Sequence, residues 1–441
     1  MIERLFHIRE SGTNIRTEVI AGVTTFLTLS YIIFVQPAVL GAAGMDEGAV
    51  MVATCVGSAF AMVLMALLAN YPIALAPAMG HNFYFSYIVV LTLGYAWQEA
   101  LGAVFIAGAA FIILSSVGLR EKLVSIMPNA IKNGIPVGIG LLIALVGLEW
   151  SGIVVGHPVT YVTLGNLVSP PTLLSILGLA VVAILLTLNI RGAILIGIFI
   201  TTVVGLLMGI VKYNGFVSAP PSISPTLLKL QIPNVLSDPN FITVIFIFFF
   251  LAMFDTVGTL IGVGQHSGFM VNGRLPKARQ ALLSDAISTS VGALLGTSTI
   301  TAYIESVTGI SAGGRTGLTN IVTAILMLLA IFFSPLIQMI GAGYKINEGV
   351  TLYPVIAPAL IVVGSMMFKN IIYVDWNDYT ESIPAFLTLI IMPLAFSITD
   401  GISIGVISYS LLKIVSGKGR EVHWLIYLFA LLFIARYIWL M

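Results

Sequence analysis

The sequence has very little charge for its length. Of its 441 residues, 8% are charged and 59% are hydrophobic, and the formal net charge is +1. Soluble domains usually carry about 25% charged residues. The shortage excludes an ordinary soluble protein and leaves no basic surface for nucleic acid. We therefore expect an integral membrane protein surrounded by the lipid bilayer.

Cysteine pairs and histidine clusters are also missing. Cys55 is the single cysteine, which excludes an intrachain disulfide and is typical of a small core residue. No metal-ligand spacing occurs among the five histidines, which are His7, His81, His157, His266 and His423. We expect no metal site, no redox chemistry and no cofactor.

Motifs for catalysis or nucleotide binding are absent as well. The Gly-rich stretches 262–268 and 311–317 lack the strand-to-helix setting and the Lys-Ser/Thr pair of a phosphate-binding loop. The sequence contains no Gly-x-Ser-x-Gly elbow, zinc-protease motif or paired catalytic histidines. The sequence does not predict an enzyme.

Long apolar runs fill the chain instead. A transmembrane helix needs about 20 apolar residues, and runs of this length recur along the whole sequence. The N-terminal segment lacks the short apolar core of a signal peptide, so the first run is expected to remain as a span. We predict an all-α membrane protein with fourteen spans, at about 16–40, 48–69, 72–93, 97–117, 123–148, 170–189, 191–211, 240–264, 278–296, 298–312, 315–340, 349–367, 382–398 and 400–416.

The basic residues predict the orientation of these spans. With a cytoplasmic N-terminus, only Lys212, Lys229 and Lys345 fall on the outer side. The cytoplasmic set is Arg4, Arg9, Arg16, Arg120, Lys122, Arg191, Arg274, Lys277, Arg279, Arg315, Lys369, Lys413, Lys418 and Arg420. We expect the plasma membrane, the inner membrane in a bacterium. The apolar tail at 422–440 is either a fifteenth crossing that carries Arg436 outward or a helix at the interface.

Fourteen spans divide into two halves of seven, and an odd number inverts the second half relative to the first. Inverted repeats are typical of secondary transporters. The third span of each half is interrupted: residues 71–87 contain Pro72 and Pro77, and residues 296–314 are rich in Thr, Ser and Gly. Interrupted spans at matching positions indicate a substrate site near the middle of the membrane.

Two carboxylates in these apolar segments are the leading candidates for function. An acid within the membrane is costly and is functional by default. Asp255 lies in the eighth span with Thr256 beside it and Thr259 one helical turn later. Glu305 follows the interrupted part of the tenth span, where a helix can restart. We expect the two acids to face a common cavity, although each could instead form a structural hydrogen bond.

Other polar and aromatic residues are weaker candidates. Asn82 in the third span could bind a ligand or cap a helix. Phe83 and Phe85 could form a flat wall for an aromatic ligand. Thr24 polarises the first span, although threonine also bonds its own helix backbone. Two further residues have structural alternatives, packing for His81 and a helix N-terminus for Asp285.

Four stretches resemble a known family. They are "FDTVGTLIGV" (254–263), "ALLSDAISTSVGALLGTSTITAYIESVTGISAGGRTGL" (281–318), "AMGHNFYFSY" (78–87) and "IPAFLTLIIMPLAFSITDGISIGVISY" (383–409). They resemble the AzgA-type guanine/hypoxanthine/adenine permeases of the nucleobase-ascorbate transporter superfamily. The likeness runs through almost the whole chain.

This resemblance implies a fold of two inverted seven-span repeats with short extended segments in spans 3 and 10. It implies a core domain of residues 16–117 and 240–340 and a gate domain of residues 118–212 and 341–441. Residues 213–239 would link the repeats, and the gate domains of two copies would form a homodimer.

The resemblance also implies the residues that bind a purine. Asp255 matches the acid of the F-D-T-V-G-T-L motif, and Glu305 that of the Y-[IV]-E-S motif, where Ile304 and Ser306 flank it. Asn82 matches the polar residue of the motif G-M-G-L-N-A-[YF]-F. This chain has Ala78, His81 and Phe83 where that motif has Gly, Leu and Ala, and these changes adjoin the expected site.

The expected mechanism is proton-coupled symport. A carboxylate accepts two N–H donors of a purine edge, and a buried carboxyl can exchange a proton as its surroundings change. Asp255 and Glu305 would bind the base and carry the proton, and the core would move against the gate in an elevator-like or rocking motion. Alternatives are sodium as the coupling ion, xanthine or uracil as the substrate, and an anion transporter of related fold.

Overall fold

The computed structural model describes residues 2–116, 126–237, 240–267, 269–270, 275–347 and 350–439. Within these ranges the chain forms two compact units. Unit 1 comprises Met1–Val117 and Gly147–Ala359, and unit 2 comprises Gly118–Val146 and Leu360–Met441. Arg120, Lys122 and Arg274 of the predicted cytoplasmic set, together with residues 123–125 of the fifth span and residue 268, lie outside the described residues. The predicted core and gate domains stay a prediction.

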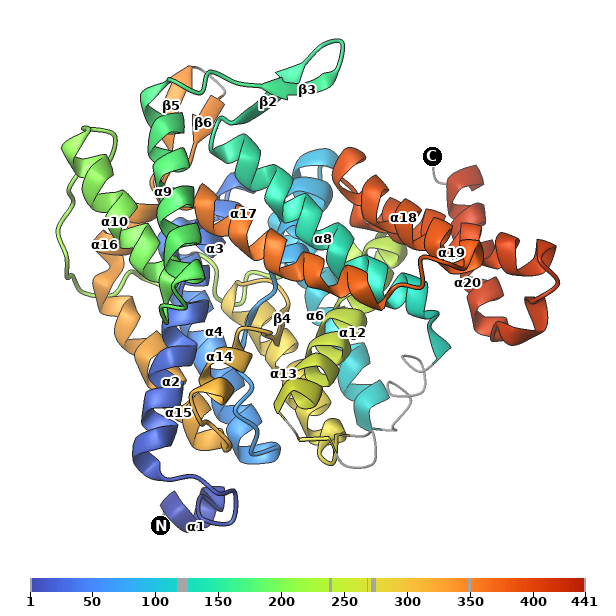
Figure 1. The fold of residues 1–441 in the computed structure, drawn as a ribbon, viewed down its shortest axis with the longest axis horizontal. Helices are drawn as coiled ribbons and strands as arrows, with labels where there is room; N and C mark the ends of the chain where they lie inside the picture. The colour runs from blue at the N-terminus through green and yellow to red at the C-terminus, as the bar shows by residue number, and fades with distance from the viewer. Residues whose placement is uncertain are drawn as a thin grey trace. The chain divides into compact units, whose positions relative to one another are not determined.

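Helices make up most of unit 1 (Figure 1). Its first half contains α1 (Ile2–Phe6), α2 (Ile15–Leu29), α3 (Ile32–Ala42), α4 (Glu47–Leu68), β1 (Leu75–Pro77), α5 (Met79–Phe83), the π-helix η1 (Tyr84–Thr92), α6 (Trp97–Ser116), β2 (Val154–His157), β3 (Tyr161–Leu164), α9 (Pro170–Thr187) and α10 (Ala193–Leu207). The rest contains α11 (Ile232–Ser237), α12 (Asn240–Ser267), α13 (Ala278–Leu295), β4 (Ile300–Ala302), α14 (Ser306–Ser311), α15 (Gly317–Ala330), η2 (Ile331–Phe333), α16 (Ser334–Gly341), β5 (Tyr344–Asn347) and β6 (Val350–Leu352).

Unit 2 is built from helices in the part of the chain that the structure describes. They are most of α8 (Asn129–Trp150) and α17 (Ala357–Met367), the 3-10 helix η3 (Phe368–Tyr373), α18 (Tyr379–Leu394), α19 (Ile398–Val415), the 3-10 helix η4 (Gly419–Glu421) and α20 (Trp424–Trp439). Helices α8 and α17 pack closely where Gly140 meets Gly364. Glycine permits this approach, because a side chain at either position would overlap the backbone of the other helix.

The helices agree with the predicted spans. Among the described residues, eight helical segments are long and apolar enough to cross a membrane, and four more apolar helices are shorter. The first predicted span is the broken pair α2 and α3, and the eleventh is the run from α15 to α16. Spans 3 and 10 each contain a short strand followed by a helix, as predicted. The hairpins β2–β3 and β5–β6 were not predicted.

The two interrupted spans meet in an antiparallel strand pair. Leu75, Ala76 and Pro77 of β1 pair with Ala302, Thr301 and Ile300 of β4. Two backbone hydrogen bonds extend the ladder, from Tyr303 N to Ala74 O and from Ala78 N to Thr299 O, each 2.9 Å long. The pair satisfies backbone groups that lipid cannot, so extended chain is tolerated inside the protein. Both strands are fully buried.

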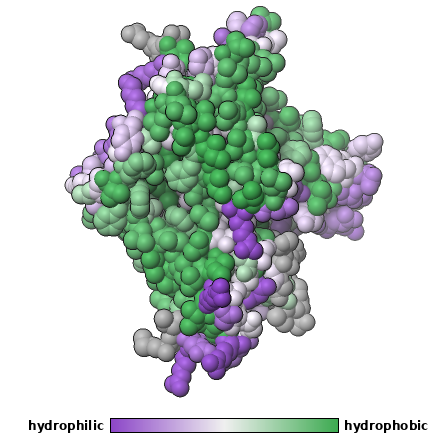
Figure 2. All heavy atoms as spheres, turned by 60° about the vertical axis from the view of Figure 1, so that its left-hand side comes forward, coloured by the Kyte–Doolittle hydropathy of each residue, from purple (hydrophilic) through white to green (hydrophobic). Residues whose placement is uncertain are grey.

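A broad apolar surface covers the face of unit 1 that carries α2, α10 and α15. Figure 2 shows hydrophobic atoms over most of this face and hydrophilic atoms gathered toward its margins. The exposed apolar side chains include Val19 and Val23 on α2, Val203 and Leu207 on α10, and Ile325 on α15. A surface this apolar fits contact with lipid chains rather than water.

The apolar tail forms α20, which lies antiparallel along α19. Ile426, Ala430 and Phe433 are buried along one stripe of α20. At its far end Arg436 pairs with Asp400 at 2.9 Å, and the Tyr437 hydroxyl donates to the same carboxylate at 2.7 Å. Asp400 lies in the first turn of α19. The charge of Arg436, near the end of the apolar helix α20, is therefore balanced by an acid at the start of α19.

Candidate functional site

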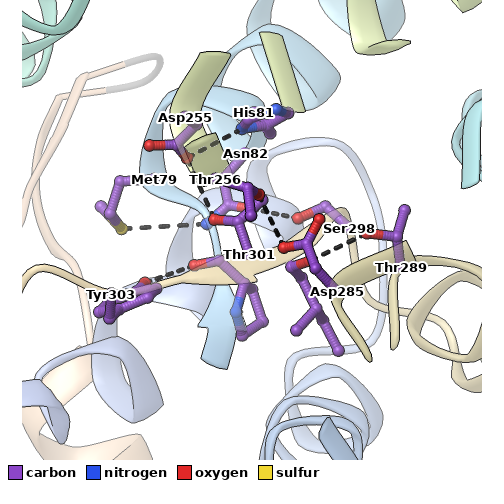
Figure 3. A network of polar contacts seen from close by, with 12 residues as sticks. Met79, His81, Asn82, Asp255, Thr256, Asp285, Thr289, Ser298, Thr301 and Tyr303 are labelled. Atoms are coloured by element: carbon purple, nitrogen blue, oxygen red, sulfur yellow. Dashed lines mark hydrogen bonds and ion pairs between the residues drawn. The ribbon is translucent and has the colours of Figure 1, made fainter. Parts of the chain in front are cut away.

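Asp255 lies on α12 next to the strand pair. One carboxylate oxygen, Oδ2, accepts a hydrogen bond from the Thr301 hydroxyl of β4 at 3.0 Å. The Nδ1 atom of His81 on α5 is 3.8 Å from the same oxygen. The side chain of Asp255 is 26% exposed, so a part of this side chain is accessible. Figure 3 shows Oδ2 directed at Thr301 and His81, and the other oxygen pointing away from both.

Glu305 lies at the start of the helix that follows β4. It is the N-cap residue of α14 and is 8% exposed. The Tyr31 hydroxyl, between α2 and α3, donates to Glu305 Oε1 at 2.9 Å. Because Thr301 binds Asp255 and lies four residues before Glu305, one segment links both acids. The common hollow that we expect between them stays a prediction.

Asn82 is held within the protein. Its side-chain nitrogen donates to Gln36 Oε1, and its oxygen accepts from the Ser298 hydroxyl. Gln36 in turn donates to Thr297 Oγ1 at 3.0 Å. Gln36, Asn82 and Ser298 are all fully buried. This amide network ties α3 and α5 to the segment just before β4.

A third acid, Asp285, joins the same region from α13. The Thr256 hydroxyl donates to Asp285 Oδ1 at 2.7 Å, and both residues are fully buried. On the same helix the Thr289 hydroxyl donates to the carbonyl of Ile300 in β4 at 2.9 Å (Figure 3). Hydroxyl groups therefore attach α12 to α13, and α13 to the strand pair.

The predicted aromatic wall is divided in the structure. Phe83 is buried and stacks on Tyr87, with ring centroids 5.7 Å apart, and lies 6.3 Å from Trp150. Phe85 is buried against Phe248 at 6.5 Å. Each phenylalanine thus packs on aromatic rings of the protein itself, and the structure does not bring Phe83 and Phe85 together in one face.

The remaining predicted residues have separate surroundings. The Thr24 hydroxyl donates to the Ile20 carbonyl of its own helix at 2.8 Å. This is the backbone hydrogen bond that we gave as the alternative to a binding role for Thr24. Ser306 donates to Tyr303 O at 2.6 Å and accepts from the backbone of Ala74. Ile304 is 44% exposed, and Thr259 is partly exposed. Their roles in binding stay predictions.

Sequence reasoning missed three residues of this site. Gln36 is an amide inside an apolar run, so the rule that draws attention to Asp255 could have found it. Thr301 lies in the interrupted tenth span but resembles its neighbouring hydroxyl residues. Tyr31 carries no distinguishing signal, because its contact with Glu305 depends on two segments 274 residues apart.

The site is acidic, and its two acids have no lysine or arginine partner in the described part of the chain. Within the described ranges, neither Asp255 nor Glu305 pairs with a Lys or Arg side chain. The same ranges contain no cluster of three His, Cys, Asp or Glu residues that could hold a metal ion. A small hollow between Phe34, Glu47 and Ile337 lies on α3, α4 and α16, and neither Asp255 nor Glu305 lines it.

Comparison with known proteins identifies the family. The sequence matches the model of the permease family over residues 16–404. The chain belongs to this family. It is 45% identical to adenine permease AdeP of Escherichia coli K12, over 100% of this chain and 96% of that protein. It is 42% identical to guanine/hypoxanthine permease PbuG of Bacillus subtilis 168, over 100% of both.

Solved structures identify the fold of this permease. The transmembrane domain of the cyanobacterial bicarbonate transporter BicA matches with a TM-score of 0.64 and 17% identity, covering 89% of this chain and 97% of that one. SLC26A9 matches with a TM-score of 0.62 and 12% identity, covering 94% and 68%. The predicted inverted-repeat fold and membership of the nucleobase-ascorbate transporter superfamily are confirmed. The chain is a membrane transport protein and not an enzyme.

Proposed function

We propose that this permease takes up the purine nucleobases hypoxanthine, guanine and adenine. The relatives AdeP and PbuG, which are named for these bases, are similar to the chain over its full length. The observation that carries the proposal is the hydrogen bonding of Asp255: Thr301 donates to its Oδ2, the side chain is partly exposed, and Oδ1 has no hydrogen-bond partner among the described residues.

A purine base matches such an acid chemically. It is planar, nearly uncharged, and has N–H donors along its edges, and a carboxylate oxygen is a strong acceptor for them. Glu305 would bind another edge of the base by exchanging its hydrogen bond from Tyr31 for one from the ligand. Thr259 would contribute a hydroxyl group, and Asn82 would contribute its amide group only by exchanging a hydrogen bond with Gln36 or Ser298 for one with the ligand.

We further infer proton coupling and alternating access. An acid held by hydroxyl groups can take up a proton and keep its partners, since a hydroxyl both donates and accepts. Asp255 and Glu305 are held in this way. The core domain would then move relative to the gate domain when it carries both the base and the proton or neither of them. It would not move when it carries only one of the two. Sodium is the alternative coupling ion.

The cellular setting follows from the same reasoning. We infer insertion in the plasma membrane with the N-terminus in the cytoplasm, because this orientation collects the basic residues on one side. We expect a homodimer formed through the gate domains. An epitope at the N-terminus should become accessible to antibody only after the membrane is permeabilised. The mass of the protein in detergent, corrected for bound detergent, should be that of a dimer.

Two other kinds of substrate, a different nucleobase and an anion, differ in how well they fit an acidic site. Xanthine or uracil would use the same hydrogen-bonding groups as a purine, so only direct competition separates them. An anion, as transported by the structurally similar BicA, would be repelled by Asp255 and Glu305, which have no Lys or Arg counter-ion within the described chain. The acidic centre therefore favours a neutral base.

Uptake by reconstituted protein tests the proposal. Proteoliposomes with an imposed inward proton gradient should accumulate radiolabelled hypoxanthine, and unlabelled adenine or guanine should compete better than xanthine or uracil. Collapse of the gradient with a protonophore should stop accumulation but not equilibration. Accumulation of bicarbonate or uracil without purine competition would overturn the assignment, and accumulation that requires sodium alone would overturn the proton coupling.

A further inference from the structure

His81 is a buried residue whose two ring nitrogens have no hydrogen-bond partner among the described residues. Its side chain is 1% exposed, and neither Nδ1 nor Nε2 makes a hydrogen bond to any residue that the structure describes. A buried polar group without a partner costs about 1–3 kcal/mol. Such groups are rare in folded proteins, and each one therefore needs an explanation.

The geometry around His81 directs it at Asp255. Nδ1 is 3.8 Å from Asp255 Oδ2, about 1 Å longer than an ordinary hydrogen bond. Thr301 already donates to that same oxygen. Oδ1 has no hydrogen-bond partner within the described residues, and Figure 3 shows it on the side away from both His81 and Thr301.

The fold fixes the two donors relative to each other. His81 lies on α5, which follows β1, and Thr301 lies on β4, which pairs with β1. The neighbouring Asn82 anchors α5 through Gln36 and Ser298. A small adjustment of the imidazole would therefore complete a two-donor clamp on one oxygen, without any movement of the backbone.

We propose that His81 is a positioning residue for substrate: its Nδ1–H and the Thr301 hydroxyl hold Oδ2 of Asp255, and Oδ1 is thereby presented to an N–H donor of the nucleobase. The inference rests on the proposed function, because it assigns a residue to the same site. Packing alone does not account for the imidazole, since a leucine would fill a similar volume and bury no polar nitrogen.

Three substitutions separate the two ring nitrogens from simple packing. His81→Leu keeps bulk and removes both nitrogens. His81→Asn keeps a polar atom near the position of Nδ1, and His81→Gln keeps one near the position of Nε2. We expect His81→Leu to raise the KM for hypoxanthine uptake about tenfold, as loss of one hydrogen bond to a charged group would, with little change in the maximal rate. Asn should restore most of the affinity and Gln should not.

Binding to detergent-solubilised protein gives a second readout that does not depend on transport. Calorimetry should show the same order of hypoxanthine affinity: wild type, then Asn, then Gln and Leu together. Elution as a single species in size-exclusion chromatography checks the fold of each variant. In the Thr301→Val background, His81→Leu should cost less than tenfold, because the clamp is already broken.

The outcomes distinguish this inference from the function on which it rests. If the wild-type protein binds no purine, the proposed function fails. If the wild type binds purine and folded His81→Leu binds equally well, only the role of His81 fails. Rescue by Gln rather than Asn, or equal losses in all three variants, would also overturn the assignment to Nδ1.

Discussion

The acids of unit 2 and those of unit 1 are stabilised in different ways. In unit 2, Glu381 pairs with Lys413 at 2.8 Å and Asp378 with Lys418 at 2.9 Å. In unit 1, Asp255 and Glu305 are bound by the hydroxyl groups of Thr301 and Tyr31. In the described part of the chain only unit 2 supplies these acids with cations, through a largely buried pair, Glu381 with Lys413, and a partly exposed pair, Asp378 with Lys418.

The difference indicates which acids can change state. A carboxylate paired with a buried lysine is fixed in its ionised form, because neutralising it would leave the cation unpaired. A carboxylate bound by hydroxyl groups loses less when it is protonated or when a ligand replaces one partner, since hydroxyls can reorient. The comparison therefore separates acids that hold the structure together from acids that are available to a substrate.

Glu18 shows that the absence of a cation is not sufficient for function. This fully buried residue of α2 accepts hydrogen bonds from the backbone of Arg315, at 2.8 Å, and of Thr319, and from the Thr319 hydroxyl at 2.6 Å. Its carboxylate thus caps the start of α15, where backbone N–H groups have no partners within the helix. The number of donors fixes Glu18, whereas one oxygen of Asp255 has no partner among the residues that the structure describes.

Asp255→Asn gives the largest expected effect and tests the comparison directly. The amide can still accept from Thr301, so the fold should persist, but it cannot carry a proton. Hypoxanthine accumulation driven by a proton gradient should fall to background in proteoliposomes. Asp378→Asn, which changes an acid at the start of α18, serves as the matched control and should keep uptake. Undiminished accumulation by Asp255→Asn would contradict the role of this acid.

Lys413→Met should affect stability rather than substrate binding. The substitution leaves Glu381 with an uncompensated charge in a site where the lysine side chain is 6% and the glutamate 18% exposed. Removing one partner of a buried pair costs about 3–5 kcal/mol. The thermal unfolding midpoint in detergent should drop, and adding Glu381→Gln should restore part of it. An unchanged midpoint would show that the acids of unit 2 do not need their cations.

Glu305→Gln should weaken purine binding about tenfold, which corresponds to about 1.4 kcal/mol. Glutamine keeps the shape and the contact with Tyr31 but loses the negative charge that strengthens a hydrogen bond from the ligand. Tyr31→Phe should leave binding nearly unchanged, because a ligand donor can take over the released oxygen. Calorimetry on solubilised protein measures both, and equal affinity for wild type and Glu305→Gln would remove this acid from the site.

The smallest effect is expected at the exposed pair of unit 2. Hydrogen bonds from Lys418 and Thr380 lower the pKa of Asp378, and the Asp378 carboxylate raises the pKa of Lys418. The aspartate contribution is therefore present above its unfolded pKa of about 3.9 and is lost as pH falls through the folded value. The lysine contribution is present below about pH 10.4 and is lost as pH rises through the folded value.

Unfolding midpoints across pH and salt measure this pair. Because the Lys418 side chain is 43% exposed, solvent and salt screen the interaction, and a small stabilisation between about pH 5 and pH 9 is expected. Asp378→Asn should reduce the loss of stability on the acid side. A midpoint that is equally sensitive to acid in this variant would assign the pH dependence to other groups.

Sequence reasoning found the acids of the site and missed what holds them. A carboxylate in an apolar span is visible in a single sequence because its burial cost is independent of its neighbours. Asp255 and Glu305 were predicted on this ground, and both lie at the strand pair. The interrupted spans were also predicted, but the pairing of Ala76 with Thr301, which brings Thr301 to Asp255, was not.

The aromatic residues show the limit of such reasoning. Adjacent positions suggested that Phe83 and Phe85 form one wall, yet they pack against Trp150 and Phe248 in different directions. The hairpin of β2 and β3 has exposed apolar residues, among them Tyr161 with a positive φ of 65°, and the apolar pattern did not predict it. Short-range patterns do not specify which distant side chain a ring will meet.

The sequence by itself determined the apolar character of the membrane spans and the position of most of them. In lipid a helix satisfies its backbone N–H and C=O groups within its own segment, so length and apolarity predict the continuous spans, whereas the interrupted spans 3 and 10 pair with each other. Only the tertiary structure decided which acids receive a cation and which receive a hydroxyl group. That choice depends on contacts between segments far apart in the chain, such as Tyr31 with Glu305 and Lys413 with Glu381.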